Sequence, residues 1–153
     1  MTISADHKPL LLAHCIALVD ASIADIKKQM SELVTEAQND SKSTAGDKHE
    51  TARAMMQLAQ EQLGKQLQEA EFKRNTLTRL DAHATHTQVA DGSIVTTSDN
   101  TLFIAAPMGK IQFEGKDVFV ISAQSPLGKL LMGKATGESV SFNQRTIAIL
   151  EVA

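Results

Sequence analysis

The sequence contains neither tryptophan nor tyrosine, and its five phenylalanines make up the whole aromatic content of 3%. A large globular core usually contains more aromatic surface than this, so the composition favours an elongated protein held together by aliphatic side chains. The aromatic platforms on which single-stranded bases usually stack are also missing. With a net charge of −3 and no strongly basic stretch, the chain lacks the usual source of affinity for nucleic acids, so we predict no independent DNA binding.

The chain has one cysteine, Cys15, so no internal disulfide can form and a cytoplasmic location is predicted. The first residues carry no signal-peptide pattern, and no uninterrupted apolar run reaches the length of a membrane span, so no membrane association is predicted. Hydrophobic residues make up 42% and charged residues 22% of the 153 residues, which is typical of a folded chain with one ordinary domain or two small ones.

Residues 6–38 contain no glycine, and their single proline, Pro9, falls in a first helical turn, where it is tolerated. Apolar residues recur at alternating steps of four and three, at Leu12, Ile16, Val19, Ile23, Ile26, Met30, Leu33 and Ala37. This spacing is that of a heptad seam. We therefore predict one continuous helix of about 50 Å, at about 1.5 Å per residue.

A second helix is predicted over residues 47–81, after a polar stretch in which Ser43 or Thr44 is a candidate cap. Its apolar residues repeat every seven positions, at Met56, Leu63, Ala70 and Leu77. Two long helices joined by a short polar turn pack antiparallel. Residues 1–81 are thus predicted to form a monomeric two-helix coiled-coil hairpin with an acidic tip at about 39–50. Coiled-coil pairing between chains is the alternative.

Residues 82–153 have the period of β-structure. Short β-type runs occupy residues 93–97, 101–106, 118–122, 139–142 and 146–152. Between the third and fourth runs, Ser125 and Pro126 start a short helix and Gly133 ends it. The predicted fold class is α+β, with the N-terminal hairpin followed by a small α+β domain.

Two motifs resemble those of the bacterial GreA/GreB transcript-cleavage factors, and the resemblance covers nearly the whole chain. At the tip, Gly46-Asp-Lys-His-Glu50 is similar to the family's Gly-Asp-x-x-Glu element, so Asp47 and Glu50 fall on its functional carboxylates. The second motif, between Ser122 and Val140, has the family's Ser-Pro helix start, a helix ending in Gly-Lys, and then Gly-Glu-x-Val. The resemblance implies an FKBP-like fold for residues 82–153.

The resemblance also implies a protein that is not an enzyme by itself but completes the active site of RNA polymerase. The tip would enter the secondary channel of the core enzyme and stimulate cleavage of backtracked RNA, meeting the RNA 3′ end only indirectly. Asp47 and Glu50 would help to hold a Mg²⁺ shared with the polymerase, which suits two-metal hydrolysis and a cation that takes one or two carboxylates. A polymerase-docking surface is carried over to Ser125, Pro126, Gly133 and Lys134.

The tip departs from the family after Glu50. The family continues Asn-Ala-Glu-Tyr, whereas this sequence has Thr51-Ala-Arg-Ala54 and so gains a cation, Arg53. This difference favours an alternative function, a channel-binding regulator or inhibitor of transcription without cleavage activity. Asp47 and Glu50 also have a structural alternative, because Asp-x-x-Glu at a helix start resembles a capping box.

Three further features receive structural interpretations. His83 and His86 have the spacing of helix-borne metal ligands, but no supporting cysteine or histidine is near in sequence, so a solvated connector is predicted. Cys15 lies beside the seam and is interpreted as a small packing residue. The absence of tyrosine and tryptophan argues against the prolyl isomerase activity that an FKBP-like domain suggests.

Overall fold

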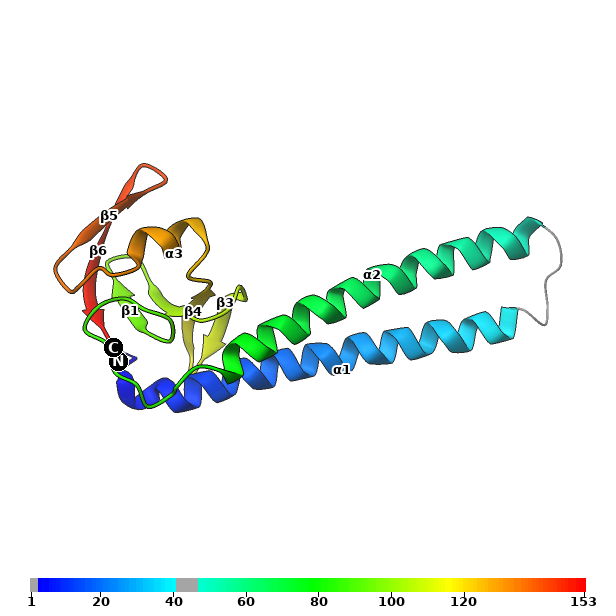
Figure 1. Ribbon diagram of the computed structural model, residues 1–153, viewed down its shortest axis with the longest axis horizontal. Helices are drawn as coiled ribbons and strands as arrows, with labels where there is room; N and C mark the ends of the chain where they lie inside the picture. Colours follow the sequence, from blue (N-terminus) through cyan, green and yellow to red (C-terminus); the bar gives the residue numbers. More distant parts are fainter. Residues whose placement is uncertain (1–2, 41–46) are drawn as a thin grey trace. The chain divides into compact units, whose positions relative to one another are not determined.

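Long helices fill the N-terminal half of the chain (Figure 1). The computed structural model describes residues 3–40 and 47–153, with the side chains of residues 40 and 47–49 outside the description. A 3₁₀ turn leads into α1 (Lys8–Asp40), and α2 follows at Asp47–Thr78. These bounds confirm the two predicted helices. The predicted turn, with the cap candidates Ser43 and Thr44, falls at 41–46 and lies outside the described residues.

The chain divides into two compact units. One is Ala17–Arg74, which contains most of both long helices. The other combines Met1–Ile16 with Asn75–Ala153 and is called here the sheet unit. The domains predicted from the sequence, at 1–81 and 82–153, stay a prediction.

The predicted seam of α1 packs against α2 within Ala17–Arg74. Ile26, Leu63 and Ala70 form a buried cluster, surrounded by half-buried side chains of Ile23, Met30, Leu33 and Leu67. Six of the eight predicted seam positions of α1, from Val19 to Ala37, lie in this unit, and all six are buried or half-buried, which confirms the heptad pattern there. On α2, Leu67 joins the predicted repeat in this packing and is half-buried, whereas its neighbour Gln66 is exposed.

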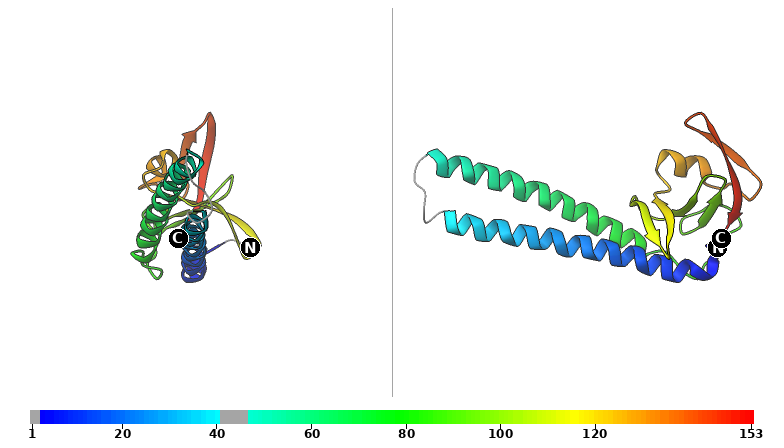
Figure 2. Two further views of the ribbon diagram at one scale, coloured as in Figure 1. Left: turned by 90° about the vertical axis from the view of Figure 1, so that its right-hand side faces the viewer. Right: turned by 180° about the vertical axis from the view of Figure 1, so that it is seen from behind.

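Within the described residues, the sheet unit is built on a mixed sheet of six strands (Figure 2). They are β1 (Ile94–Thr97), β2 (Thr101–Ile104), β3 (Gly109–Phe113), β4 (Lys116–Ile121), β5 (Ser139–Phe142) and β6 (Arg145–Val152). Their order across the sheet is β3-β4-β2-β1-β6-β5. The β2–β4 pair is parallel and the remaining pairs are antiparallel, so the α+β fold class is confirmed.

Strand β3 was not predicted, although its signal is visible in the sequence. Ile111 and Phe113 alternate with exposed Lys110 and Gln112, the pattern of an edge strand with one buried face. Glu114 and Gly115, both with positive φ, then form the two-residue connection to β4. The run was missed because only two of its five residues are apolar.

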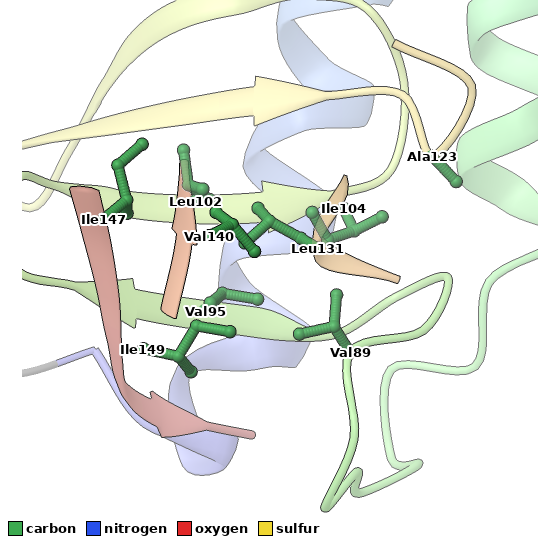
Figure 3. Packing of buried hydrophobic residues seen from close by; sticks show 9 residues of the cluster. All are labelled: Val89, Val95, Leu102, Ile104, Ala123, Leu131, Val140, Ile147 and Ile149. Atoms are coloured by element: carbon green, nitrogen blue, oxygen red, sulfur yellow. The ribbon is translucent and has the colours of Figure 1, made fainter. Parts of the chain in front are cut away.

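One face of the sheet carries the core that α3 (Pro126–Leu131) covers. Figure 3 shows its buried side chains, which come from four strands, α3 and the flanking connections: Val89, Val95, Leu102, Ile104, Ala123, Leu131, Val140, Ile147 and Ile149. Phe103 points to the other face of β2 and is also fully buried, so both faces of the sheet are covered. On that side, His14 of α1 lies against Phe113, with ring centroids 5.7 Å apart.

Helix α1 is more apolar than the sequence prediction allowed. By length and composition alone, Ala5–Asn39 is sufficient to cross a membrane, with a mean hydropathy of 1.7 in its best window. The prediction considered uninterrupted apolar runs, whereas a window average tolerates residues such as Asp20 that interrupt them. A helix with a seam packed against its own chain passes the same test, and Asp20 forms an ion pair with Arg74 of α2. That the chain acts away from membranes stays a prediction.

Candidate functional site

The first turn of α2 contains both acidic residues predicted at the tip. The helix begins at Asp47, and Glu50 follows three residues later with an exposed side chain. Gly46, the first residue of the motif, and the side chain of Asp47 lie outside the described residues. The start of a helix is the positive end of its dipole, so acidic residues are favoured there electrostatically whatever their further role.

The donor set at the tip suits a hard cation. Carboxylate oxygens are the ligands that Mg²⁺ takes in proteins, and this ion usually keeps several waters. Among the residues that the structure describes, no group of three or more histidine, cysteine, aspartate or glutamate side chains can hold a metal ion. Two carboxylates supply only part of the coordination shell of Mg²⁺. The remaining ligands would have to come from water or from a partner.

The second predicted site begins at the N-terminus of α3. Ser125 is the N-cap, and its Oγ accepts a hydrogen bond from the Gly128 amide at 3.0 Å. The same hydroxyl donates to the Ser122 carbonyl at 2.7 Å. Pro126 occupies the first helical position, where its missing N–H costs nothing, and it is exposed. The Ser-Pro pair thus has a folding role that is complete within this chain.

Gly128 is a residue that the sequence interpretation did not single out. A Cβ at this position would lie 2.2 Å from the Ser122 carbonyl oxygen and 2.9 Å from Ser125 Oγ. Only glycine therefore allows α3 to start so close to the end of β4. The signal that could have found it is the glycine itself, inside a predicted helix where alanine would be the better helix former.

Gly133 and Lys134, at the other end of α3, bind the connector that precedes the sheet. The Gly133 amide donates to the Val89 carbonyl at 2.8 Å, and the Val89 amide donates to the Lys134 carbonyl at 2.8 Å. Gly133 has φ +80, which favours glycine. The four predicted docking residues are therefore placed at two ends of one short helix, and Asp47 and Glu50 belong to the other compact unit.

The connector histidines differ from each other. His83 is exposed, as a solvated connector predicts, but His86 is half-buried, and its Nε2 has no hydrogen-bond partner among the described residues. Nearby, Lys8 of α1 is only 1% exposed and its Nζ donates to the Ala84 carbonyl at 2.8 Å. Burial lowers the pKa of Lys8, partly opposed by Asp81. The connector is thus held against the start of α1, which the sequence did not show.

Acid is expected to destabilise the sheet unit through His86. Burial, and secondarily the charge of Lys8, lowers the pKa of His86 below its ordinary 6.5. The unfolded chain then binds this proton at a higher pH than the folded chain, so the stability is full above pH 6.5 and decreases as the pH falls below it and through the folded-state pKa. The fall in Tm between neutral and mildly acidic buffer should be smaller in His86→Phe than in wild type. His83→Gln is the control and should keep the wild-type fall; equal falls in all three proteins would contradict the prediction.

Comparisons with known proteins give distant structural neighbours. No family model and no curated protein matches the sequence. The crystal structure of the GreA factor homolog 1 (Gfh1) protein of Thermus thermophilus is similar with a TM-score of 0.35 and 15% identity, over 90% of this chain and 94% of that chain. A structure of the transcription factor Gfh1 gives 0.36 and 16%, over 90% and 92%. At these values the likeness is distant and carries no conclusion about function.

Proposed function

We propose that the chain is a Gre-type transcription factor that binds RNA polymerase and inserts its hairpin tip into the secondary channel to stimulate cleavage of backtracked RNA. One observation carries the proposal. Asp47 and Glu50 share the first turn of α2, in a hairpin whose helices are joined by a buried seam. A pair of helices is narrow enough to bring two carboxylates into a space that a globular domain cannot enter.

At the tip, Asp47 and Glu50 would offer oxygen ligands from one side of an ion shared with the polymerase. In such a two-metal site, one Mg²⁺ would supply activation of a water for attack on the phosphodiester and the other would supply stabilisation of the leaving oxygen. A carboxylate that is not coordinated directly would accept a hydrogen bond from a metal-bound water and so orient it. The chain would have no cleavage activity of its own, because the other ligands and the RNA are held by the polymerase.

The sheet unit would dock on the polymerase through the region of Ser125, Pro126, Gly133 and Lys134. Pro126 and Gly133 are exposed and the other two residues are half-buried, so the contact would involve both ends of α3. The order of strands around one crossing helix supports an FKBP-like description of this unit. The protein would act as a cytoplasmic monomer.

The test is an RNA-cleavage assay on backtracked complexes of the cognate polymerase. Asp47→Asn/Glu50→Gln removes both tip charges at nearly constant volume, and it should lower the rate of RNA 3′-fragment release by about 100-fold or more, the scale of losing charge-stabilising groups in an active site. Binding to the core enzyme should be unchanged. Glu61→Gln/Glu71→Gln, at exposed positions farther along α2, is the matched control and should stimulate fragment release by the polymerase as wild type does. Equal fragment release by the tip variant and wild type would refute the cleavage role.

A second candidate function is regulation or inhibition of polymerase through the same channel without cleavage. Arg53 favours it, because this exposed cation is one turn after Glu50 on α2 and would oppose cation binding. In that case wild type binds the core enzyme and lowers initiation or elongation, and no RNA fragments are released. Arg53→Glu would then be expected to weaken inhibition.

A further inference from the structure

A groove of about 380 Å³ runs between α1 and α2 within Ala17–Arg74. Its apolar part comes from Leu33, Leu63 and Ala59, which are half-buried or buried. The small side chain of Ala59 leaves room where a larger residue would close the space between the helices. The groove is therefore a feature of the helix pair itself, formed by residues that also belong to the seam or lie beside it.

The walls of this groove are polar and carry charge of one sign. Glu32 and Glu36 line it from α1, one helical turn apart, and Gln62 and Gln66 line it from α2. Neither glutamate forms an ion pair within the described part of the chain, although Lys28 lies one turn before Glu32. Two like charges one turn apart destabilise a helix slightly. A cation placed between them would remove that repulsion.

We propose that this groove binds arginine side chains of a partner protein. The aliphatic parts of two arginines would cover Leu33 and Leu63, while each guanidinium would donate to one of the carboxylates of Glu32 and Glu36. The side-chain carbonyls of Gln62 and Gln66 would accept their remaining N–H groups across the groove. Arginine fits better than lysine because its guanidinium is planar, weakly hydrated and has five donors in a fixed arrangement.

The inference rests on the proposed function for the identity of the partner, which would be RNA polymerase. Charge decides against other occupants, since a nucleic acid would be repelled by the two glutamates. The spacing of Glu32 and Glu36 also sets the spacing of the ligand. Two arginines one helical turn apart on the partner would face the two carboxylates together.

The groove is tested first without polymerase. The probe is a capped, alanine-based helical peptide with two arginines four residues apart, and its match has citrulline at both positions. In NMR titrations, the arginine peptide should shift the side-chain amides of Gln62 and Gln66 saturably, and citrulline should weaken binding about fivefold or more. Glu32→Gln/Glu36→Gln should weaken binding equally, and Glu61→Gln/Glu71→Gln should not. Equal binding of both peptides would overturn the inference.

Binding to core RNA polymerase is measured next with the same variants at low and high salt. The groove variant should bind about fivefold more weakly at low salt and lose most of the salt dependence, as expected for a charged contact. Ala59→Leu, which fills the groove without changing its charge, should also weaken binding, whereas Ala21→Leu at an exposed position of α1 should not. If polymerase binds all variants equally, the groove assignment fails and the proposed function stands. If it binds none, wild type included, the proposed function fails and the peptide result decides the groove.

Discussion

Replacing Gly128 with alanine is expected to unfold the sheet unit at a much lower temperature than wild type. The new Cβ would lie 2.2 Å from the Ser122 carbonyl oxygen, and that oxygen belongs to the backbone and already accepts the hydrogen bond from Ser125 Oγ. Relief therefore requires α3 to move away from the end of β4. We expect a loss of about 3 kcal/mol, the upper range for overpacking a buried site. Hydrogen exchange over residues 94–152 measures it.

Gly64→Ala is the matched control for this substitution. Gly64 lies within α2, and apart from its chain neighbours and the backbone of its own helix no atom is within 4 Å of the position that a Cβ would occupy. Alanine should therefore stabilise the helix by about 0.5–1 kcal/mol, because glycine is the poorer helix former. A Gly128→Ala protein that melts together with wild type would contradict the role given to Gly128.

The second large effect is expected in the hairpin, on replacing Ile26 with alanine. Ile26 is 6% exposed and packs in the same cluster as Leu63 and Ala70. Its truncation leaves a cavity in the buried seam, so the hairpin should lose about 2–4 kcal/mol. Loss of helical circular dichroism on heating measures the change. Val34→Ala is the control on the same helix, because Val34 is 47% exposed.

Val34→Ala should alter stability by less than about 0.5 kcal/mol. Similar losses for Val34→Ala and Ile26→Ala would show that the seam does not hold the helices together. The Ile26 variant also separates support from chemistry at the tip. This variant retains Asp47 and Glu50. If the proposed cleavage stimulation is lost only at temperatures where the hairpin unfolds, the loss is due to the weakened seam and not to the tip carboxylates.

The hairpin could be predicted because its information is local and periodic. Eight apolar residues of α1 repeat at steps of four and three, and that spacing corresponds directly to one face of a helix. On α2, Leu67 packs in the seam although it lies outside the seven-residue repeat of Met56, Leu63, Ala70 and Leu77, because burial depends on the facing helix as well as on the repeat. Strand β3 was missed for a related reason, since only Ile111 and Phe113 reveal a strand whose other residues face water.

Some contacts around the candidate sites could not be predicted because they need the three-dimensional path of the chain. The crowding at Gly128 depends on how closely α3 follows the end of β4, and the charge that acts on His86 comes from Lys8 at the start of the chain. The first involves neighbouring residues whose spacing in space no periodic pattern gives, and the second joins residues far apart in the sequence. Ser125 and Pro126 were recognised as a helix start, and the structure confirms that part of their interpretation. That Asp47 and Glu50 hold a metal ion stays a prediction, because another molecule would have to supply the remaining ligands of that ion.

The sheet unit is assembled from two segments separated by the hairpin, and this has a consequence for folding order. The Lys8–Ala84 hydrogen bond joins positions 76 residues apart, and the bond from His14 to Gln112 spans 98. Closing such long loops in an open chain costs entropy. The contacts within the hairpin join residues that are nearer in sequence, and one of them is the hydrogen bond that Arg74 Nε donates to Asp20 at 2.6 Å. A paired hairpin therefore shortens the loop that has to close when the sheet unit assembles. During synthesis, the two helices can therefore pair before β1 has left the ribosome and bring the segments of the sheet unit together.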